Sequence, residues 1–160
     1  MKIKVNEIIP DINVFQLIDG EPVKSKITDI IKEKKIVIFG LPGAFTSTCS
    51  KIHLPGYVNS FEKFQSKGID KILCISVNDP FVMGAWGKSN NANDKISMIA
   101  DPFIEFTKAI GADVDISVRG LGIRSKRYAM LINNLKIVEI QEEIGTGCEL
   151  SSAENILDLI

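Results

Sequence analysis

The sequence has little of what several classes of protein need. No apolar run approaches the roughly 20 residues that span a bilayer, and Asn6, Glu7 and Pro10 interrupt the N-terminal region before a signal-peptide core could form. The formal net charge is -1, with 19 basic and 20 acidic residues, so the chain has no strong field for a polyanion or an acidic membrane. We therefore expect a cytoplasmic protein that binds neither nucleic acid nor membrane.

Cysteine and histidine are also scarce. The chain of 160 residues has three cysteines and one histidine, and no C-x-x-C pair. Such a set matches neither a secreted disulfide framework nor a zinc site. A thiol-disulfide oxidoreductase of the thioredoxin type also needs C-x-x-C, and Thr46 stands where its first cysteine would be. We expect no metal, haem or flavin, and redox reactivity is the property of interest in the cysteines.

Apolar residues make up 45% of the chain, which is enough for a sizeable core. They occur in segments that predict strands alternating with helices. Its length predicts a single domain over residues 1–160. Continuous apolar character at 36–41 and 71–77 predicts buried parallel strands, joined by a helix that Pro55-Gly56 should kink or interrupt. The other predicted elements are strands at 14–18 and 96–100, helices at 28–31, 80–86 and 103–110, a loop at 113–124, a hairpin of 128–132 with 135–140, and a last helix with a Ser151–Glu154 capping box. Together they predict an α/β sandwich.

Cys49 follows a predicted strand and turn at the start of a predicted helix. Pro42-Gly43 ends the strand, and residues 46–48 are all credible N-cap residues. Cys49 therefore falls in the first helical turn, where unpaired backbone N–H groups favour a thiolate over a thiol. A helix terminus supplies only about 0.3 to 1 kcal/mol. A strong nucleophile would need a second cationic partner, which makes the arginines of interest.

The spacing P-x-x-x-T-x-x-C of Pro42, Thr46 and Cys49 resembles the active-site signature of the peroxiredoxins. The segments Ser-Val-Asn-Asp-Pro-Phe-Val-Met at 76–83 and Gly-Leu-Gly-Ile-Arg-Ser-Lys-Arg at 120–127 extend this resemblance to the type II, peroxiredoxin 5-like subfamily over nearly the whole chain. The first motif alone would often arise by chance, but the three together are specific. The resemblance implies a thioredoxin-like three-layer sandwich with a central mixed sheet, in agreement with the α/β pattern.

The resemblance also implies a peroxidase that reduces hydrogen peroxide and alkyl hydroperoxides. Cys49 would be the peroxidatic cysteine, whose thiolate attacks the peroxide and becomes a sulfenic acid. Thr46 would contact the peroxide, and Pro42 would shield the thiolate from water. Arg124, by its place in Gly-Ile-Arg-Ser, would stabilise the thiolate and hold the peroxide.

Three further side chains leave alternatives open. Arg119 and Arg127 are rivals of Arg124 that spacing does not exclude, although we expect both to be solvated. His53 lies four residues after Cys49 on the same helical face, which could suggest a cysteine hydrolase. No orienting Asn or Asp is evident, which argues against a hydrolase. The resemblance, in which a histidine lies near the pocket, implies that His53 tunes the pocket without acting as a base.

Two cysteines are candidates for the resolving thiol. Cys74 lies in a predicted buried strand, and from this position alone we expect it to be part of the core. In the plant-type and related bacterial type II enzymes, however, the resolving cysteine occupies this position. A Cys49–Cys74 disulfide would require the helix start to unwind, because the Cα atoms must come within about 7 Å. Cys148 lies in a flexible loop and is the weaker candidate, since the animal cysteine aligns with Leu150.

The resemblance also concerns partners. Glutaredoxin with glutathione, or thioredoxin, would recycle the sulfenic acid, and a homodimer is expected. Phe81, Met83 and Trp86 should be mostly core, although in the family this segment also lines the dimer contact. The alternative from another class is a redox-sensing or chaperone-like binding protein, in which oxidised Cys49 signals to a partner.

Overall fold

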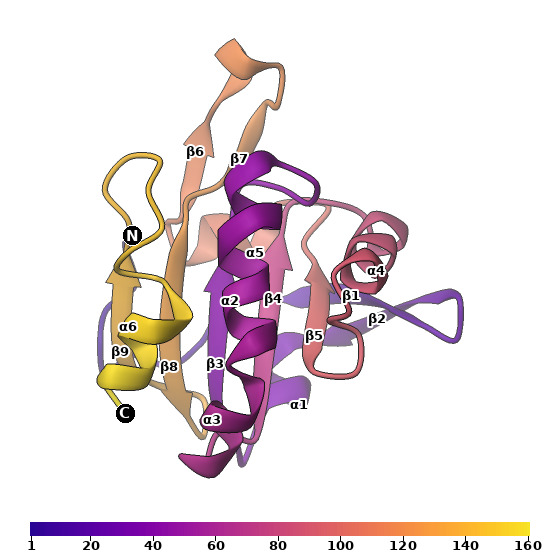
Figure 1. Cartoon of the computed structure of the whole chain (residues 1–160). Coiled ribbons are helices and arrows are strands. Elements are labelled where there is room, and N and C mark those ends of the chain that lie inside the picture. The colour runs from indigo at the N-terminus through magenta and orange to yellow at the C-terminus, as the bar shows by residue number, and fades with distance from the viewer.

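The computed structural model describes all 160 residues and is built on a seven-stranded mixed sheet in the order β2-β1-β5-β4-β3-β8-β9 (Figure 1). The strands are β1 (Asn13–Ile18), β2 (Glu21–Lys26), β3 (Lys35–Gly40), β4 (Lys71–Ser76), β5 (Ile96–Ala100), β8 (Tyr128–Asn133) and β9 (Lys136–Glu142). The pairs β3–β4 and β4–β5 are parallel, and the other pairs are antiparallel. This arrangement confirms the predicted mixed sheet.

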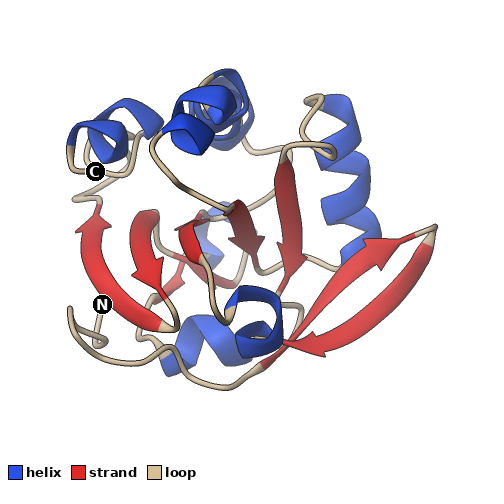
Figure 2. Ribbon diagram, turned by 90° about the horizontal axis from the view of Figure 1, so that it is seen from below, coloured by secondary structure: helices blue, strands red, loops and turns tan.

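Helices cover both faces of the sheet (Figure 2). One face carries α2 (Leu54–Asn59), α3 (Phe61–Ser66), α4 (Pro80–Ser89) and α6 (Ala153–Asp158), and the other carries α1 (Ile27–Ile31) and α5 (Glu105–Ala109). The buried apolar residues accordingly form two clusters, one on each side of the sheet. No helix combines the length and the apolar character needed to cross a membrane. The three layers confirm the predicted sandwich.

The segment predicted as a loop at 113–124 contains regular structure instead. It forms β6 (Asp113–Asp115), a 3-10 turn (Ser117–Arg119) and β7 (Ile123–Ser125), with β6 and β7 antiparallel. Gly120 and Gly122 have φ of 73° and 68°, values that glycine adopts without steric cost, and they reverse the chain between the strands. This β6–β7 extension projects from one end of the molecule (Figure 1).

The last helix is capped one residue later than predicted. The Ser152 side chain accepts a hydrogen bond from the backbone N–H of Asn155 at 3.2 Å. The Ser151 hydroxyl instead donates to Glu143 Oε1 at 2.8 Å. The predicted Ser151–Glu154 capping box is therefore wrong, because a carboxylate distant in sequence engages Ser151.

The helix that starts at residue 47 widens in its second turn. Residues Cys49–His53 form a π-turn, in which the N–H of Leu54 donates to the Cys49 carbonyl five residues back. Pro55 has no N–H, and in a regular α-helix its ring would clash with the carbonyl of Lys51. A wider turn relieves that clash, and such turns are frequent at functional sites. The predicted disturbance at Pro55 is thus present as a widening of the helix.

Candidate active site

Cys49 lies in the first turn of the helix that follows β3. The helix begins at residue 47, and its first backbone bond runs from the N–H of Ser50 to the Thr46 carbonyl at 3.0 Å. The Cys49 side chain is fully buried. The predicted strand, turn and helix around the thiol are therefore confirmed.

The turn between β3 and this helix is held from two sides. Asn78, between β4 and α4, accepts a hydrogen bond from the N–H of Ala44 at 3.0 Å. Arg124, in β7, donates from Nη1 to the Pro42 carbonyl at 3.4 Å. A Cβ atom on Gly43 would lie 3.0 Å from that same Nη1, so glycine permits this close approach. Both side chains therefore position the turn that carries the site.

The hydroxyl of Thr46 is oriented by this turn. It donates to the Gly43 carbonyl at 2.8 Å, so its proton is already engaged. The lone pairs of the oxygen remain available to accept a hydrogen bond from a ligand. Thr46 lines the cavity of the site, and its contact with a peroxide stays a prediction.

The arginine beside the thiol is Arg127. Its Nη2 donates to Cys49 Sγ at 3.3 Å, and the residue is only 7% exposed. The prediction that Arg127 is solvated is therefore wrong. Arg124, which was predicted to stabilise the thiolate and hold the peroxide, donates instead to the Leu121 and Pro42 carbonyls. Arg124 lies in the small β6–β7 sheet, whereas Arg127 immediately precedes β8. Because β8 pairs with β3 and aligns Tyr128 with Gly40, Arg127 is delivered to the end of the strand that leads to Cys49.

His53 holds the other side of the Arg127 guanidinium. Arg127 Nη1 lies 3.0 Å from His53 Nδ1, and a guanidinium only donates, so Nδ1 accepts. The imidazole proton is then on Nε2, which donates to the Ser151 carbonyl at 3.0 Å. The hydroxyl of Tyr57 donates to the same carbonyl at 2.8 Å. These bonds connect the thiol side of the site to the loop before α6.

The imidazole of His53 is neutral. Burial, and next the positive charge of Arg127, lower the pKa of His53 to about 3, although the bond to the Ser151 carbonyl acts in the opposite direction. Its Nδ1 already accepts a hydrogen bond from Arg127, so it is not available to take a proton from another group. This geometry gives His53 no role as a base for a cysteine hydrolase and supports the predicted tuning role.

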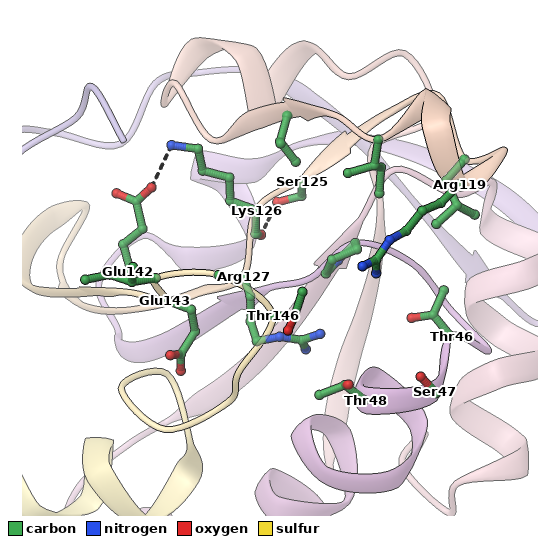
Figure 3. Close-up of a pocket in the computed structure, with 16 residues that line it drawn as sticks. Thr46, Ser47, Thr48, Arg119, Ser125, Lys126, Arg127, Glu142, Glu143 and Thr146 are labelled. Carbon is green, nitrogen blue, oxygen red and sulfur yellow. Dashed lines mark hydrogen bonds and ion pairs between the residues drawn. The ribbon is translucent and has the colours of Figure 1, made fainter.

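A cavity of about 670 Å³ is lined by Thr46 and Thr48, which precede Cys49, and by Arg127, whose guanidinium contacts the buried thiol (Figure 3). Its floor includes Thr46 and Arg127, and Pro42 borders it. The β6–β7 extension and the loop between β9 and α6 supply its walls. The lining residues are Pro42, Thr46, Ser47, Thr48, Val114, Ile116, Arg119, Leu121, Ser125, Lys126, Arg127, Glu142, Glu143, Ile144, Gly145 and Thr146. No group of three or more His, Cys, Asp or Glu side chains is arranged to hold a metal ion.

The other two cysteines lie on different structural elements. Cys74 is fully buried in β4 and belongs to the same apolar cluster as Cys49. Burial, followed by the charge of Cys49, raises the pKa of Cys74 well above its ordinary value. Cys148 is half-buried in the loop after β9; burial raises its pKa, and Arg127 opposes that rise. All three thiols are free.

The segment that opens α4 is mixed in exposure. Met83 and Trp86 are buried, as predicted, whereas Phe81 is 56% exposed. The indole N–H of Trp86 donates to Ser50 Oγ at 3.0 Å, which ties α4 to the turn after Cys49. Sequence reasoning missed this bond, the Asn78 contact and the Ser151 carbonyl, because each joins segments far apart in the chain.

Comparison with known proteins agrees with this geometry. The Redoxin family model matches residues 4–157, and Peroxiredoxin-2D of Arabidopsis thaliana is 43% identical over 156 residues, covering 97% of this chain and 96% of that protein. The chain belongs to the peroxiredoxins of the redoxin family. Its peroxiredoxin fold is also seen in solved structures. Reduced Prx3 of Vibrio vulnificus in complex with hydrogen peroxide superposes with a TM-score of 0.94, at 41% identity and 98% coverage of each chain.

A second solved structure is similar over the whole chain. It comes from Burkholderia cenocepacia, is described as a putative thioredoxin reductase, and has a TM-score of 0.97 at 42% identity, with coverage of 100% of this chain and 99% of that one. The peroxiredoxin relatives confirm the predicted family and its thioredoxin-like fold.

Proposed function

We propose that residues 1–160 form a single thioredoxin-like domain that reduces hydrogen peroxide and alkyl hydroperoxides through Cys49. As a peroxiredoxin, the chain is a thiol-dependent peroxidase with an antioxidant function. The observation that carries the assignment of the nucleophile is the 3.3 Å contact between Cys49 Sγ and Arg127 Nη2 in the first turn of a helix. A buried guanidinium and free helical N–H groups both stabilise negative charge on sulfur.

In the proposed reaction the Cys49 thiolate attacks one oxygen of the hydroperoxide. The S–O bond forms as the O–O bond breaks, and the leaving oxygen takes a proton to become water or an alcohol. Arg127 donates to the oxygens on which charge develops, and Thr46 accepts the bond of the peroxide O–H, which orients it. Pro42, at the cavity border, limits the access of water to the sulfur.

The sulfenic acid then needs a thiol. Attack by a thiol forms a disulfide and releases water, and a second thiol breaks that disulfide. We propose Cys74 as the first internal candidate, because it shares a core cluster with Cys49, and Cys148 as the second. The raised pKa of Cys74 leaves little thiolate until the helix start unwinds. Glutaredoxin with glutathione, or thioredoxin, would complete the cycle without a prosthetic group.

The assembly and location are also proposals. Phe45 and Phe81 are 60% and 56% exposed, and both flank the segments that carry the site. Exposed aromatic side chains of this kind support a homodimer whose contact borders the active site. The cytoplasm stays our prediction for the location, and one relative from rice is named as chloroplastic.

The reaction can be tested with one equivalent of peroxide on the reduced protein, followed by peptide mass spectrometry. Oxidation must begin at Cys49; peroxide consumption by a Cys49→Ser variant at the wild-type rate would contradict the proposal. A Cys49–Cys74 disulfide that Cys74→Ser removes would establish the two-cysteine cycle. Cys148→Ser is the matched control, and it would lose the disulfide only if Cys148 is the resolving thiol. Cys49 left as sulfenic or sulfinic acid would indicate the one-cysteine cycle with glutathione and glutaredoxin.

The same reduced protein can also be used to distinguish a peroxidase from the alternative, a redox-sensing binding protein. A redox sensor would oxidise once and stop under excess reductant, whereas a peroxidase turns over in a coupled assay. A thioredoxin-type oxidoreductase would instead need a cysteine at Thr46.

A further inference from the structure

The cavity beside Arg127 and Thr46 is much larger than hydrogen peroxide requires. Hydrogen peroxide is little larger than water, whose share of liquid volume is about 30 Å³, whereas the cavity measures about 670 Å³. That volume lies in the range of sites for organic ligands, about 300 to 1,000 Å³. The walls of the cavity therefore carry information about a larger substrate.

The wall formed by the β6–β7 extension carries three of the four apolar side chains that line the cavity. Val114, Ile116 and Leu121 project from the β6–β7 extension, and Ile144 comes from the loop after β9. Ile144 is 92% exposed, so its side chain is free to contact a ligand in the cavity. This wall suits the hydrocarbon part of an organic hydroperoxide.

The charged groups of the cavity are paired, with one exception. Glu142 is bound by Lys126 at 2.7 Å and by the N-terminal amine. Glu143 accepts bonds from the N–H and hydroxyl of Ser151. Arg127 is engaged by Cys49 and His53.

Arg119 is that exception. It forms no ion pair and its side chain makes no hydrogen bond within the chain. Its guanidinium nevertheless points into the cavity from the β6–β7 extension (Figure 3). An unpaired guanidinium beside an apolar wall provides a planar fork of donors for a carboxylate.

We infer that Arg119 recognises the carboxylate of a fatty-acid hydroperoxide, whose O–O group reaches Cys49 while its chain lies along the apolar wall. This inference rests on the proposed peroxidase function and adds a substrate class to it. The bound carboxylate would replace the missing anionic partner of Arg119. Neutral hydroperoxides and hydrogen peroxide would not use this contact.

The test compares kcat/KM for a fatty-acid hydroperoxide, its methyl ester and hydrogen peroxide. In Arg119→Gln we expect roughly a 5- to 20-fold fall for the acid, the size of one charge-assisted contact at an exposed site, and less than a two-fold change for the ester and for hydrogen peroxide. Arg119→Lys should recover part of the loss. The preference for the acid over the ester should also weaken with added salt, because the contact is electrostatic.

Lys24→Gln is the matched control, since Lys24 is exposed on β2 at the opposite edge of the sheet from β9. Equal falls for acid and ester would overturn the inference. So would a higher KM for glutathione with unchanged acid turnover, because the carboxylate would then belong to the reductant. Failure of the wild type to reduce any hydroperoxide would instead refute the proposed function, which keeps the two failures distinguishable.

Discussion

The floor of the cavity and its rim, which carries the exposed side chains of Arg119 and Ile144, differ in how many of their polar groups have hydrogen-bond partners. On the floor, Arg127 and His53 are buried, and hydrogen bonds link Cys49 through Arg127 and His53 to the Ser151 carbonyl. On the rim, Arg119 is exposed and unpaired, and Ile144 is 92% exposed. The floor is preorganised before any ligand arrives, whereas the rim gains partners only when a ligand binds. Chemistry should therefore depend on the floor and selectivity on the rim.

The largest effect should come from the nucleophile. Cys49→Ser keeps a small side chain in the buried site but replaces the thiol by a poor nucleophile, so we expect a loss of peroxidase activity of more than about 1,000-fold. Peroxide consumption gives the activity, and thermal unfolding followed by circular dichroism should show that the fold persists. Cys148→Ser, at a half-buried loop position, serves as the control and should retain the rate of the first peroxide step.

The second prediction compares two arginines that the sequence did not separate. Arg127→Met removes the cation next to the sulfur, and we expect kcat/KM for hydrogen peroxide to fall about 100- to 1,000-fold. Arg124→Met removes hydrogen bonds to the Pro42 and Leu121 carbonyls but no contact with the sulfur, and we expect roughly a 3- to 10-fold fall. Stopped-flow oxidation of Cys49 measures both. A larger loss in Arg124→Met would restore the assignment made from sequence.

The third prediction concerns stability rather than rate. The unfolded chain protonates its one histidine below about pH 6.5, whereas the folded chain does so only near pH 3, because burial and Arg127 lower the pKa of His53. The unfolded state therefore binds more protons within this window, and stability falls as the pH falls through it. Between pH 7 and pH 5 the wild type should lose about 1 to 2 kcal/mol more than His53→Gln, which cannot titrate.

Urea unfolding of both proteins at pH 7, 6 and 5 measures that difference. Carboxylates titrate in both proteins alike, so their contribution cancels. Parallel stability curves for the wild type and His53→Gln would mean that folding does not lower the pKa of His53.

The smallest effect should be at the apolar rim. Ile144→Ser should raise KM about 2- to 4-fold for both a fatty-acid hydroperoxide and its methyl ester, because it removes apolar contact without changing charge. Hydrogen peroxide turnover and the melting temperature should stay the same, since Ile144 is exposed. Steady-state kinetics with the three peroxides checks this. A change confined to the acid would contradict the division of roles between Ile144 and Arg119.

Local sequence patterns anticipated much of the fold. The β5 strand was predicted at its observed bounds, and the helix predicted at 80–86 is present as the first part of α4. The β2 strand was missed, because Glu21–Lys26 is polar, contains a proline and forms an exposed edge. The β6–β7 pair was missed for a related reason: strands of three residues carry too short a pattern to be distinguished from a loop.

The sequence by itself determined the position of Cys49, because a strand, a turn and a helix that follow one another place a residue in the first helical turn by local geometry alone. Only the tertiary structure decided which arginine faces the sulfur. Arg124 and Arg127 are three residues apart, but one joins a small separate sheet and the other precedes β8, whose pairing with β3 sets its place. The same applies to Ser151, whose hydroxyl donates to Glu143 instead of capping the last helix. Contacts between distant segments depend on strand pairing and burial, which no short stretch of sequence contains.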